Sequence, residues 1–322
     1  MDALRNARLT RFRALFIAVT ALLAASCSSA PRTPDTVTET KDRAAEYAEF
    51  GNRYFTEGSH QQALRFFELA LRENTSVDNR SGIAQTYNSI GSVYLAMGDI
   101  PTAEASFTSA YEIAVAIDDP RLLLQSATHL GEVALRRGDT SLAMDFFERA
   151  LEERGPRAEP ADLAILYHNI ATIHSRAGDY ESAERFLSDA MEINRDQRRL
   201  PELASNHYML ASVYSRQGRY DAAFSEAGRA LELDKRIENS VGIAADLTAL
   251  GLISARKGEL DAARDFLERA LQVAATVGLV PQAKSILDEL AGFADELGLP
   301  DEAARYREQR RALDEQTAQE DE

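Results

Sequence analysis

The sequence predicts an all-α protein built as a solenoid of helical hairpins, and two series of small residues support this prediction. Glycine recurs every 40 residues, and an alanine follows each such glycine by five residues. The glycines are Gly58, Gly98, Gly138, Gly178, Gly218, Gly258 and Gly298, and the alanines are Ala63, Ala103, Ala143, Ala183, Ala223, Ala263 and Ala303. A fixed period of about 20–50 residues is typical of arrays whose units bury a core only by stacking on their neighbours. Since Leu and Ala dominate the apolar residues, which favours helix, we expect one helical array at residues 43–312.

The charge and cysteine content exclude several classes of protein. The 322 residues carry a formal net charge of −16, and the isoelectric point is about 4.9. An acidic chain is poorly suited to the phosphate backbone, so we expect no nucleic-acid partner. The single cysteine, Cys27, excludes an internal disulfide and a cysteine-rich metal site.

The first residues have the layout of a secretory signal peptide. An apolar stretch at residues 14–25 follows a basic start and ends in Ser26 and Cys27. The basic residues of the start are Arg5, Arg8, Arg11 and Arg13. The apolar stretch is shorter than the roughly 18–20 residues that span a bilayer.

The stretch from Leu23 to Cys27 resembles a bacterial lipobox, in which the cysteine is lipidated and becomes the first residue of the mature protein. It departs from the pattern at Ala24, where Leu is usual. Because no Asp follows the cysteine (Ser28 stands there), the resemblance implies an outer-membrane lipid anchor facing the periplasm. The alternative is an ordinary signal peptide with an incidental cysteine. Residues 1–26 are thus the expected signal peptide, and residues 27–42, which lack aromatics and periodicity, a disordered tether.

The second repeat shows the predicted hairpin best. In its first half, Tyr87, Ile90, Gly91 and Tyr94 follow one another in steps of three and four residues, so they share one helical face. Gly98 ends this helix, because glycine accepts the left-handed conformation needed just past a helix C-terminus.

The second half of this repeat opens with Asp99 and Pro101, which favour a helix start. Ala103, Phe107 and Ala110 then follow at helical spacing. The small residue in each half lets the two helices approach closely, while the aromatic residues fill the space beside them.

This pattern resembles the tetratricopeptide repeat, in which a large residue, Leu-Gly, Tyr, a turn glycine, Ala, Phe and Ala occur at set spacings. Repeat 1 matches it with Tyr47, Phe50, Gly51, Tyr54, Gly58, Ala63, Phe67 and Ala70. The family standard is about 34 residues, so the resemblance is to the long-repeat branch, such as the kinesin light chains. HEAT repeats share the 40-residue period but lack this spacing of small residues. The resemblance implies a right-handed α-solenoid of about seven helix-turn-helix repeats, with the extra residues lengthening the second helix and its loop.

The seventh repeat departs from the pattern in the way a terminal repeat requires. Ala294 replaces the tyrosine, and Arg307 and Arg310 replace the Phe and the final Ala. A polar last helix suits a repeat that has no neighbour on one side. We expect residues 313–322 to be an acidic disordered tail.

The resemblance also implies that the first helix of each repeat lines a concave groove for a protein or peptide. The expected groove is polar and rich in hydroxyl groups, with few charges. Its central members are Asn52, Asn88, Thr128, His168 and Tyr208, with Phe55, Ser92, Leu95, Glu132, Thr172, Ser212 and Thr248 beside them.

Four arginines at 40-residue spacing form a series along one edge of this groove: Arg136, Arg176, Arg216 and Arg256. They would receive carboxylates of a partner by paired hydrogen bonds. Alternatively, each cation simply suits the C-terminal end of its helix, with about 0.3–1 kcal/mol of stabilisation.

The sequence contains no strong catalytic or metal motif. The histidines His60, His129, His168, His174 and His207 form no HExxH or other ligand spacing. His129 and Glu132 lie three residues apart, which makes at most half of a metal site. With no phosphate-binding glycine loop and no serine elbow, we expect no cofactor, no metal and no enzyme.

These observations predict a membrane-anchored periplasmic scaffold or adaptor that binds proteins or peptides, with a role in cell-envelope assembly. One alternative is a regulatory module that senses a signalling peptide. Another is an enzyme acting on the cell wall through groove carboxylates. The sequence leaves the partner and the oligomeric state open.

Overall fold

The computed structural model describes residues 36–153, 155 and 158–320, which form fourteen helices and no strand. The helices are α2 (Thr36–Thr56), α3 (His60–Ser76), α4 (Arg80–Ala96), α5 (Ile100–Ile117), α6 (Pro120–Arg136), α7 (Thr140–Glu153), α8 (Pro160–Ala177), α9 (Tyr180–Asp196), α10 (Leu200–Arg216), α11 (Tyr220–Arg236), α12 (Ser240–Arg256), α13 (Leu260–Thr276), α14 (Val280–Glu296) and α15 (Pro300–Glu320). The predicted signal peptide and Cys27 lie outside the described residues. No described helix is both long and apolar enough to cross a membrane.

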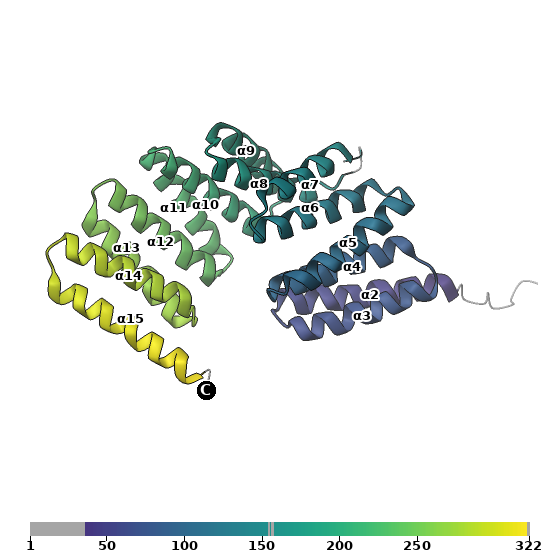
Figure 1. The fold of residues 1–322 in the computed structure, drawn as a ribbon, viewed down its shortest axis with the longest axis horizontal. Coiled ribbons are helices and arrows are strands. Elements are labelled where there is room, and N and C mark those ends of the chain that lie inside the picture. The colour runs from purple at the N-terminus through teal and green to yellow at the C-terminus, as the bar shows by residue number, and fades with distance from the viewer. Residues whose placement is uncertain (1–35, 154, 156–157, 321–322) are drawn as a thin grey trace, which may run out of the picture.

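The helices pair into seven antiparallel hairpins, which we number 1 to 7 from α2–α3 to α14–α15. The hairpins follow one another round an arc, with α2–α3 and α14–α15 at its two ends (Figure 1). The first helices of successive hairpins also contact one another, as α4 does with α6 and α6 with α8. We call the first helices the inner helices and the second helices the outer helices. The predicted α-solenoid is therefore confirmed.

The turns inside the hairpins use the glycines of the 40-residue series. Gly98 has a φ of +81°, and the other six glycines of the series are also left-handed. Asp99 then caps α5, because its carboxylate accepts a hydrogen bond from the Thr102 backbone N–H at 3.2 Å. The turn prediction for repeat 2 is thus confirmed.

The residues beyond the family's standard repeat length enter the helices rather than a long loop. Most helices have 17 residues, and only three residues separate Ser76 at the end of α3 from Arg80 at the start of α4. The predicted lengthening of the second helix therefore holds, whereas the loop after it stays short. The connection between Glu153 of α7 and Pro160 of α8 is longer.

The solenoid extends beyond both boundaries that the sequence predicted. Helix α2 begins at Thr36, so seven residues of the expected tether are helical, and Arg43 of this helix pairs with Glu73 of α3 at 3.0 Å. At the other end, α15 continues to Glu320, which makes most of the expected disordered tail helical.

The end of α15 is held by α14. Lys284 of α14 contacts the Asp314 carboxylate at 3.0 Å and the Thr317 hydroxyl at 2.9 Å. An acidic composition suggested disorder, but acidic and basic groups on facing helices compensate one another here.

Each of hairpins 1 to 3 closes on a glycine packed against a phenylalanine. A Cβ added to Gly91 would lie 2.6 Å from Phe107 Cε1, and the Phe107 side chain is fully buried. Hairpin 4 has alanine and leucine at the same two positions, Ala171 and Leu187, both fully buried. Compared with hairpins 1 to 3, hairpin 4 thus has a larger residue on the inner helix and a smaller one on the outer helix.

We expect Gly91→Ala to destabilise the protein by about 1–3 kcal/mol, because the new methyl group overlaps the Phe107 ring. Helix propensity alone would favour alanine by about 1 kcal/mol, so the sign of the change reports the steric effect. The double variant Gly91→Ala/Phe107→Leu reproduces the pair of hairpin 4 and should cost less than the two single changes together. The measurement is the free energy of unfolding in urea.

Gly228→Ala is the matched control, because a Cβ there meets no atom within 4 Å. This variant should stabilise α11. Stabilisation by Gly91→Ala, or strict additivity of the double variant, would contradict the steric explanation.

Candidate functional site

Three hollows open between inner helices, and we name them by their position along the chain. The N-terminal hollow has a volume of about 250 Å³ and lies between α4, α6 and α8. The central hollow, of about 120 Å³, lies between α8 and α10, and the C-terminal hollow, of about 230 Å³, between α10 and α12.

Most of the residues that line these hollows have polar side chains, although apolar atoms make up the larger part of the lining surface. The N-terminal hollow is lined by Gln85, Asn88, Ser89, Ser92, Arg121, Gln125, Thr128, His129, Asp162 and Ile165. The central hollow is lined by Ala164, Ile165, His168, Asn194, Glu202, Ser205 and Asn206. The C-terminal hollow is lined by Tyr208, Ser212, Ser215, Arg216, Thr248, Ala249, Leu252, Ile253 and Arg256.

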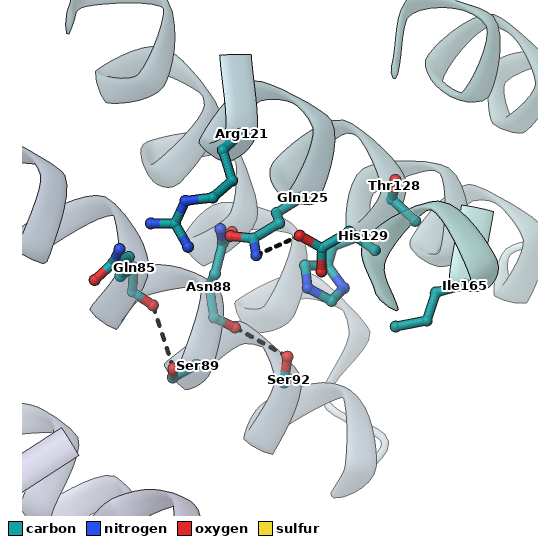
Figure 2. Close-up of a pocket in the computed structure, with 10 residues that line it drawn as sticks. Gln85, Asn88, Ser89, Ser92, Arg121, Gln125, Thr128, His129 and Ile165 are labelled. Carbon is teal, nitrogen blue, oxygen red and sulfur yellow. Dashed lines mark hydrogen bonds between the residues drawn. The ribbon is translucent and has the colours of Figure 1, made fainter. Parts of the chain in front are cut away.

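The N-terminal hollow presents donors and acceptors that are only partly used within the protein. Gln125 of α6 donates to Asp162 Oδ2 of α8 at 2.7 Å, which joins two inner helices across the hollow (Figure 2). Arg121 extends into the same space, and its guanidinium forms no hydrogen bond or ion pair within the described part of the chain. Burial raises the pKa of Asp162, while the hydrogen bond from Gln125 opposes this shift. The charge of Arg121 also opposes the rise in the pKa of Asp162, so the hollow combines a cation that forms no hydrogen bond with a shielded carboxyl group nearby.

Asn88 is the most constrained polar group of this hollow. Its side chain is 7% exposed, and its Nδ2 faces the Ser126 hydroxyl at 3.5 Å. Its Oδ1 is buried and accepts no hydrogen bond within the described residues. A buried acceptor without a partner costs about 1–3 kcal/mol, which a ligand N–H could offset.

A chain of amide groups connects the central hollow to the junction between hairpins 4 and 5. The His168 Nδ1 accepts from Asn206 Nδ2 at 3.2 Å, and Asn206 Oδ1 accepts from Asn194 Nδ2 at 2.8 Å. Burial lowers the pKa of His168, although Glu132 acts in the opposite direction. The imidazole is consequently neutral near pH 7, as an accepting Nδ1 requires.

The next junction carries two carboxyl groups at the positions of these two asparagines. Asp234 of α11 is 5% exposed and Asp246 of α12 is 1% exposed. Burial, together with the charge and hydrogen bond of Asp234, raises the pKa of Asp246 to about 8. Asp234 also accepts from Asn239 Nδ2 at 3.1 Å, so at neutral pH this pair shares one proton, held on Asp246.

The four arginines of the predicted series lie exposed in the last turn of their inner helices, but their surroundings differ. Arg136 pairs with Glu132 on the same helix at 3.2 Å. Arg176 has no partner in the described part of the chain and lines none of the three hollows. Arg216 and Arg256 both line the C-terminal hollow. The structure thus brings two of the four together at one site.

The structure places most of the predicted central groove residues at the hollows. Asn88 and Thr128 line the N-terminal one, His168 the central one and Tyr208 the C-terminal one. Asn52 is exposed on α2 and lines none of the three.

Sequence reasoning missed several of the lining residues, among them four polar ones of the N-terminal hollow on the inner helices: Gln85, Arg121, Gln125 and Asp162. The signal that could have found them is helical spacing. Arg121, Gln125 and Thr128 follow in steps of four and three residues, so the groove face continues to the first turn of α6.

Within the described residues, no group of three or more His, Cys, Asp or Glu side chains could hold a metal ion. The His129 ring stacks on Phe107, with the ring centroids 4.6 Å apart. Burial lowers its pKa, and Glu132 opposes that shift. His129 therefore acts as a packing residue at the edge of the N-terminal hollow.

The repeats identify the class of protein. The tetratricopeptide repeat family model matches residues 43–116, 82–152, 162–236 and 202–276. These matches cover more than half of the chain, and the chain belongs to the tetratricopeptide repeat family.

Solved structures with the same fold come from proteins of several kinds. The quorum sensor NprR from B. thuringiensis, in its apo form, has a TM-score of 0.67 at 18% identity, covering 84% of this chain and 76% of NprR. A Rap protein complexed with Competence and Sporulation Factor has a TM-score of 0.63 at 17% identity, covering 86% and 76%. BtubC from P. vanneervenii has a TM-score of 0.59 at 18% identity, covering 68% and 92%. Among curated protein sequences, none matches this chain.

We expect Asp246→Asn to stabilise the protein at neutral pH. In the folded chain the pKa of Asp246 is about 8, far above the roughly 3.9 of an unfolded aspartate, so the folded state binds the extra proton. The unfolding free energy therefore falls as pH rises from about 4 to 8, with a slope of up to about 1.4 kcal/mol per pH unit. Asparagine removes this contribution and reproduces the neutral group of Asn206.

The measurement is the unfolding free energy of both proteins between pH 5 and pH 9, with exposed Asp189→Asn as the control. The Asp246→Asn advantage should grow with pH, whereas the control should follow the wild type. An advantage that is independent of pH would show that Asp246 carries no extra proton in the folded state.

Proposed function

We propose that this protein is a scaffold or adaptor that binds an unfolded or helical segment of a partner protein along its inner helices. The observation that carries the proposal is the N-terminal hollow. There, the buried Asn88 Oδ1 lacks a donor and the Arg121 guanidinium lacks an acceptor within the described residues. A peptide backbone supplies both kinds of group in every residue.

The arrangement of the three hollows supports a peptide, rather than a compact small molecule, as the ligand. The three hollows lie in succession along the inner helices, and each is open to solvent rather than enclosed. An extended ligand can contact all three, since it gains one set of polar contacts from each successive hairpin.

A second candidate function is that of a regulator that senses a signalling peptide. The similarity to the apo quorum sensor NprR and to the Rap protein complexed with Competence and Sporulation Factor favours it. Both candidates use the same groove, and they differ in what the bound peptide does. In a regulator, a free peptide changes the activity of the protein, whereas in an adaptor the peptide is a segment of the protein to be held.

We further propose that the chain is a lipoprotein anchored through Cys27 in the outer membrane, with the solenoid in the periplasm and a role in cell-envelope assembly. The lipobox-like residues before Cys27 and the basic, then apolar, start of the chain support this proposal. The first described residue, Thr36, follows Cys27 by nine residues, so the solenoid would lie close to the anchoring surface.

The binding proposal is tested with the full chain on an array of random 12-residue peptides. Gln85→Ala and Arg121→Ala should each weaken binding to most captured peptides by about fivefold to tenfold, because both side chains line the N-terminal hollow. Gln272→Ala is the matched control, since Gln272 is exposed on the outer helix α13. Failure to capture any peptide, or equal loss in the control, would overturn the proposed groove.

The anchor is tested by Cys27→Ser in a Gram-negative host. The wild-type chain should incorporate labelled palmitate and fractionate with the outer membrane, while the serine variant should do neither, because it lacks the thiol that is acylated. An unlabelled wild-type chain in the soluble periplasmic fraction would indicate an ordinary signal peptide, and a cytoplasmic chain would favour the regulator.

A further inference from the structure

We infer that an apolar hollow at the last junction of the solenoid binds the acyl chain of a membrane lipid whose head group stays outside. The hollow has a volume of about 490 Å³ and is lined by the end of α13, the first half of α14 and the second half of α15. It shares no lining residue with the three hollows of the inner helices. The choice of a lipid rests on the proposed anchor at Cys27, whereas the apolar site itself does not depend on it.

The walls of this hollow are apolar. Leu271, Leu279, Val280 and Leu313 supply much of the lining, and Gln309 is the only polar side chain in it within the described part of the chain. The volume falls in the range of roughly 300–1,000 Å³ that is typical of small-molecule sites. Water finds no hydrogen-bond partners against such walls, so an aliphatic chain is the ligand that suits them.

One large side chain that is present at every other junction is missing here. At the repeat position of Ala283, the other five junctions carry a branched aliphatic residue: Ile83, Leu123, Leu163, Leu203 and Ile243. Ala283 is buried and contributes only a methyl group. The walls of an unfilled apolar site lose the contacts that a side chain would make, so this hollow lowers stability unless a ligand fills it.

The connection from α13 to α14 also lacks the polar residues of the other connections. Leu279 is the N-cap of α14 and forms no side-chain cap, whereas Asp119 and Asn239 at the same repeat position cap their helices. The position before it is Gly278, where four other connections carry a charged residue: Asp78, Asp118, Arg198 and Glu238. A local rule broken without a compensating contact is typical of functional positions.

The hollow lies on the edge of the solenoid on which the chain would be anchored. Every inner helix begins and every outer helix ends on this edge, because successive helices alternate in direction. Thr36, nine residues after Cys27, lies there, and so does the α13–α14 connection. Three exposed valines also lie near helix ends on this edge: Val115, Val241 and Val277. In an anchored chain, the acyl chains of the membrane are thus the apolar groups that this edge meets.

The charges favour a lipid over a free fatty acid. No cation lines the hollow within the described residues, and Lys284, which follows Ala283, is paired with Asp314 at 3.0 Å. The formal net charge of −16 repels a free carboxylate. A zwitterionic lipid brings no net charge, and its head group can remain in water while one chain enters the hollow.

The site is tested with the full chain carrying Cys27→Ser, so that the chain has no acyl group of its own. Its methyl resonances are followed while diheptanoylphosphatidylcholine is added below its micelle concentration. The methyl groups of Leu279, Val280 and Leu313 should shift and saturate, because these residues line the hollow. Glycerophosphocholine, the head group alone, should shift none of them. Heptanoate should bind more weakly than the lipid, since its carboxylate finds no cation.

The methyl groups of Leu142, exposed on the outer helix α7, report lipid that adsorbs without a site. Absence of saturation at the hollow, or an equal response at Leu142, would overturn the inference. Tighter binding of heptanoate than of the lipid would also overturn it, because the ligand would then be a free fatty acid.

Two variants restore residues that the other hairpins carry. Ala283→Leu fills the hollow and should weaken lipid binding by at least about tenfold without loss of stability. Ala312→Glu places a charge at an exposed lining position and should cause a similar loss, because an acyl chain cannot solvate it. Four outer helices carry this glutamate: Glu112, Glu152, Glu192 and Glu232.

Gln272→Glu is the matched control for the charge. It adds the same group at the same repeat position of α13, where the side chain is exposed and lies outside the hollow. This variant should bind the lipid as the wild type does. Unchanged binding in both Ala283→Leu and Ala312→Glu, or an equal loss in Gln272→Glu, would contradict a site in this hollow.

Two further measurements separate the inference from its neighbours. Sedimentation equilibrium without lipid shows whether a second copy fills the hollow: a dimer that Ala312→Glu converts to monomers would overturn the inference. Palmitate labelling at Cys27 tests the anchor independently. A labelled Cys27 beside a hollow that does not saturate would overturn the inference and leave the anchor, whereas a saturable hollow in an unlabelled chain would overturn the anchor and support the acyl-chain site.

Discussion

The structure depends on how closely the two helices of each hairpin approach. At the point of closest approach the inner helix carries glycine or alanine, and in hairpins 1 to 4 and 6 the outer helix carries a buried Phe or Leu side chain that fills the space, as Phe107 does against Gly91. The two helices of each hairpin thereby pack closely. Each hairpin stacks on the one before it, and the seven together form the arc in Figure 1.

The junctions between hairpins are where this array departs from uniformity. The same pair of positions holds Asn74 and Thr86, then Asn194 and Asn206, and then Asp234 and Asp246. Amide and hydroxyl groups bring no charge into a buried site, whereas two carboxyl groups there hydrogen-bond one another only by sharing a proton, and the pair then keeps one negative charge. The acidic junction lies near the C-terminal hollow, since the charge of Asp246 acts on Tyr208, which lines that hollow. Below about pH 8 Asp246 holds the shared proton, so the pair carries one negative charge rather than two.

The groove is accordingly divided into regions of different chemistry rather than being a uniform polar surface. Amides and a free arginine characterise the N-terminal hollow, and two arginines with hydroxyl groups characterise the C-terminal hollow. The smaller central hollow between them is bordered by a neutral histidine and asparagines. A peptide lying along the inner helices would meet amides and one arginine at the N-terminal hollow and two arginines at the C-terminal hollow.

The sequence by itself determined the repeat, because turn glycines and close-packed small residues are local requirements that recur at each hairpin. It determined the helix order and the hairpin turns, and it predicted the helical face on which four of the five expected central residues line the hollows, since side chains on one helical face follow from spacing alone. The sequence also shows the residue one helical turn before each arginine, such as Glu132, Ser212 or Leu252, but only the tertiary structure decided which hollow each guanidinium reaches. The tertiary structure also decided the ends of the solenoid, since Arg43 and Lys284 hold segments to neighbouring helices that composition alone marks as disordered. Contacts between residues 30 or more positions apart leave no periodic trace in the sequence, and these contacts distinguish one repeat from the next.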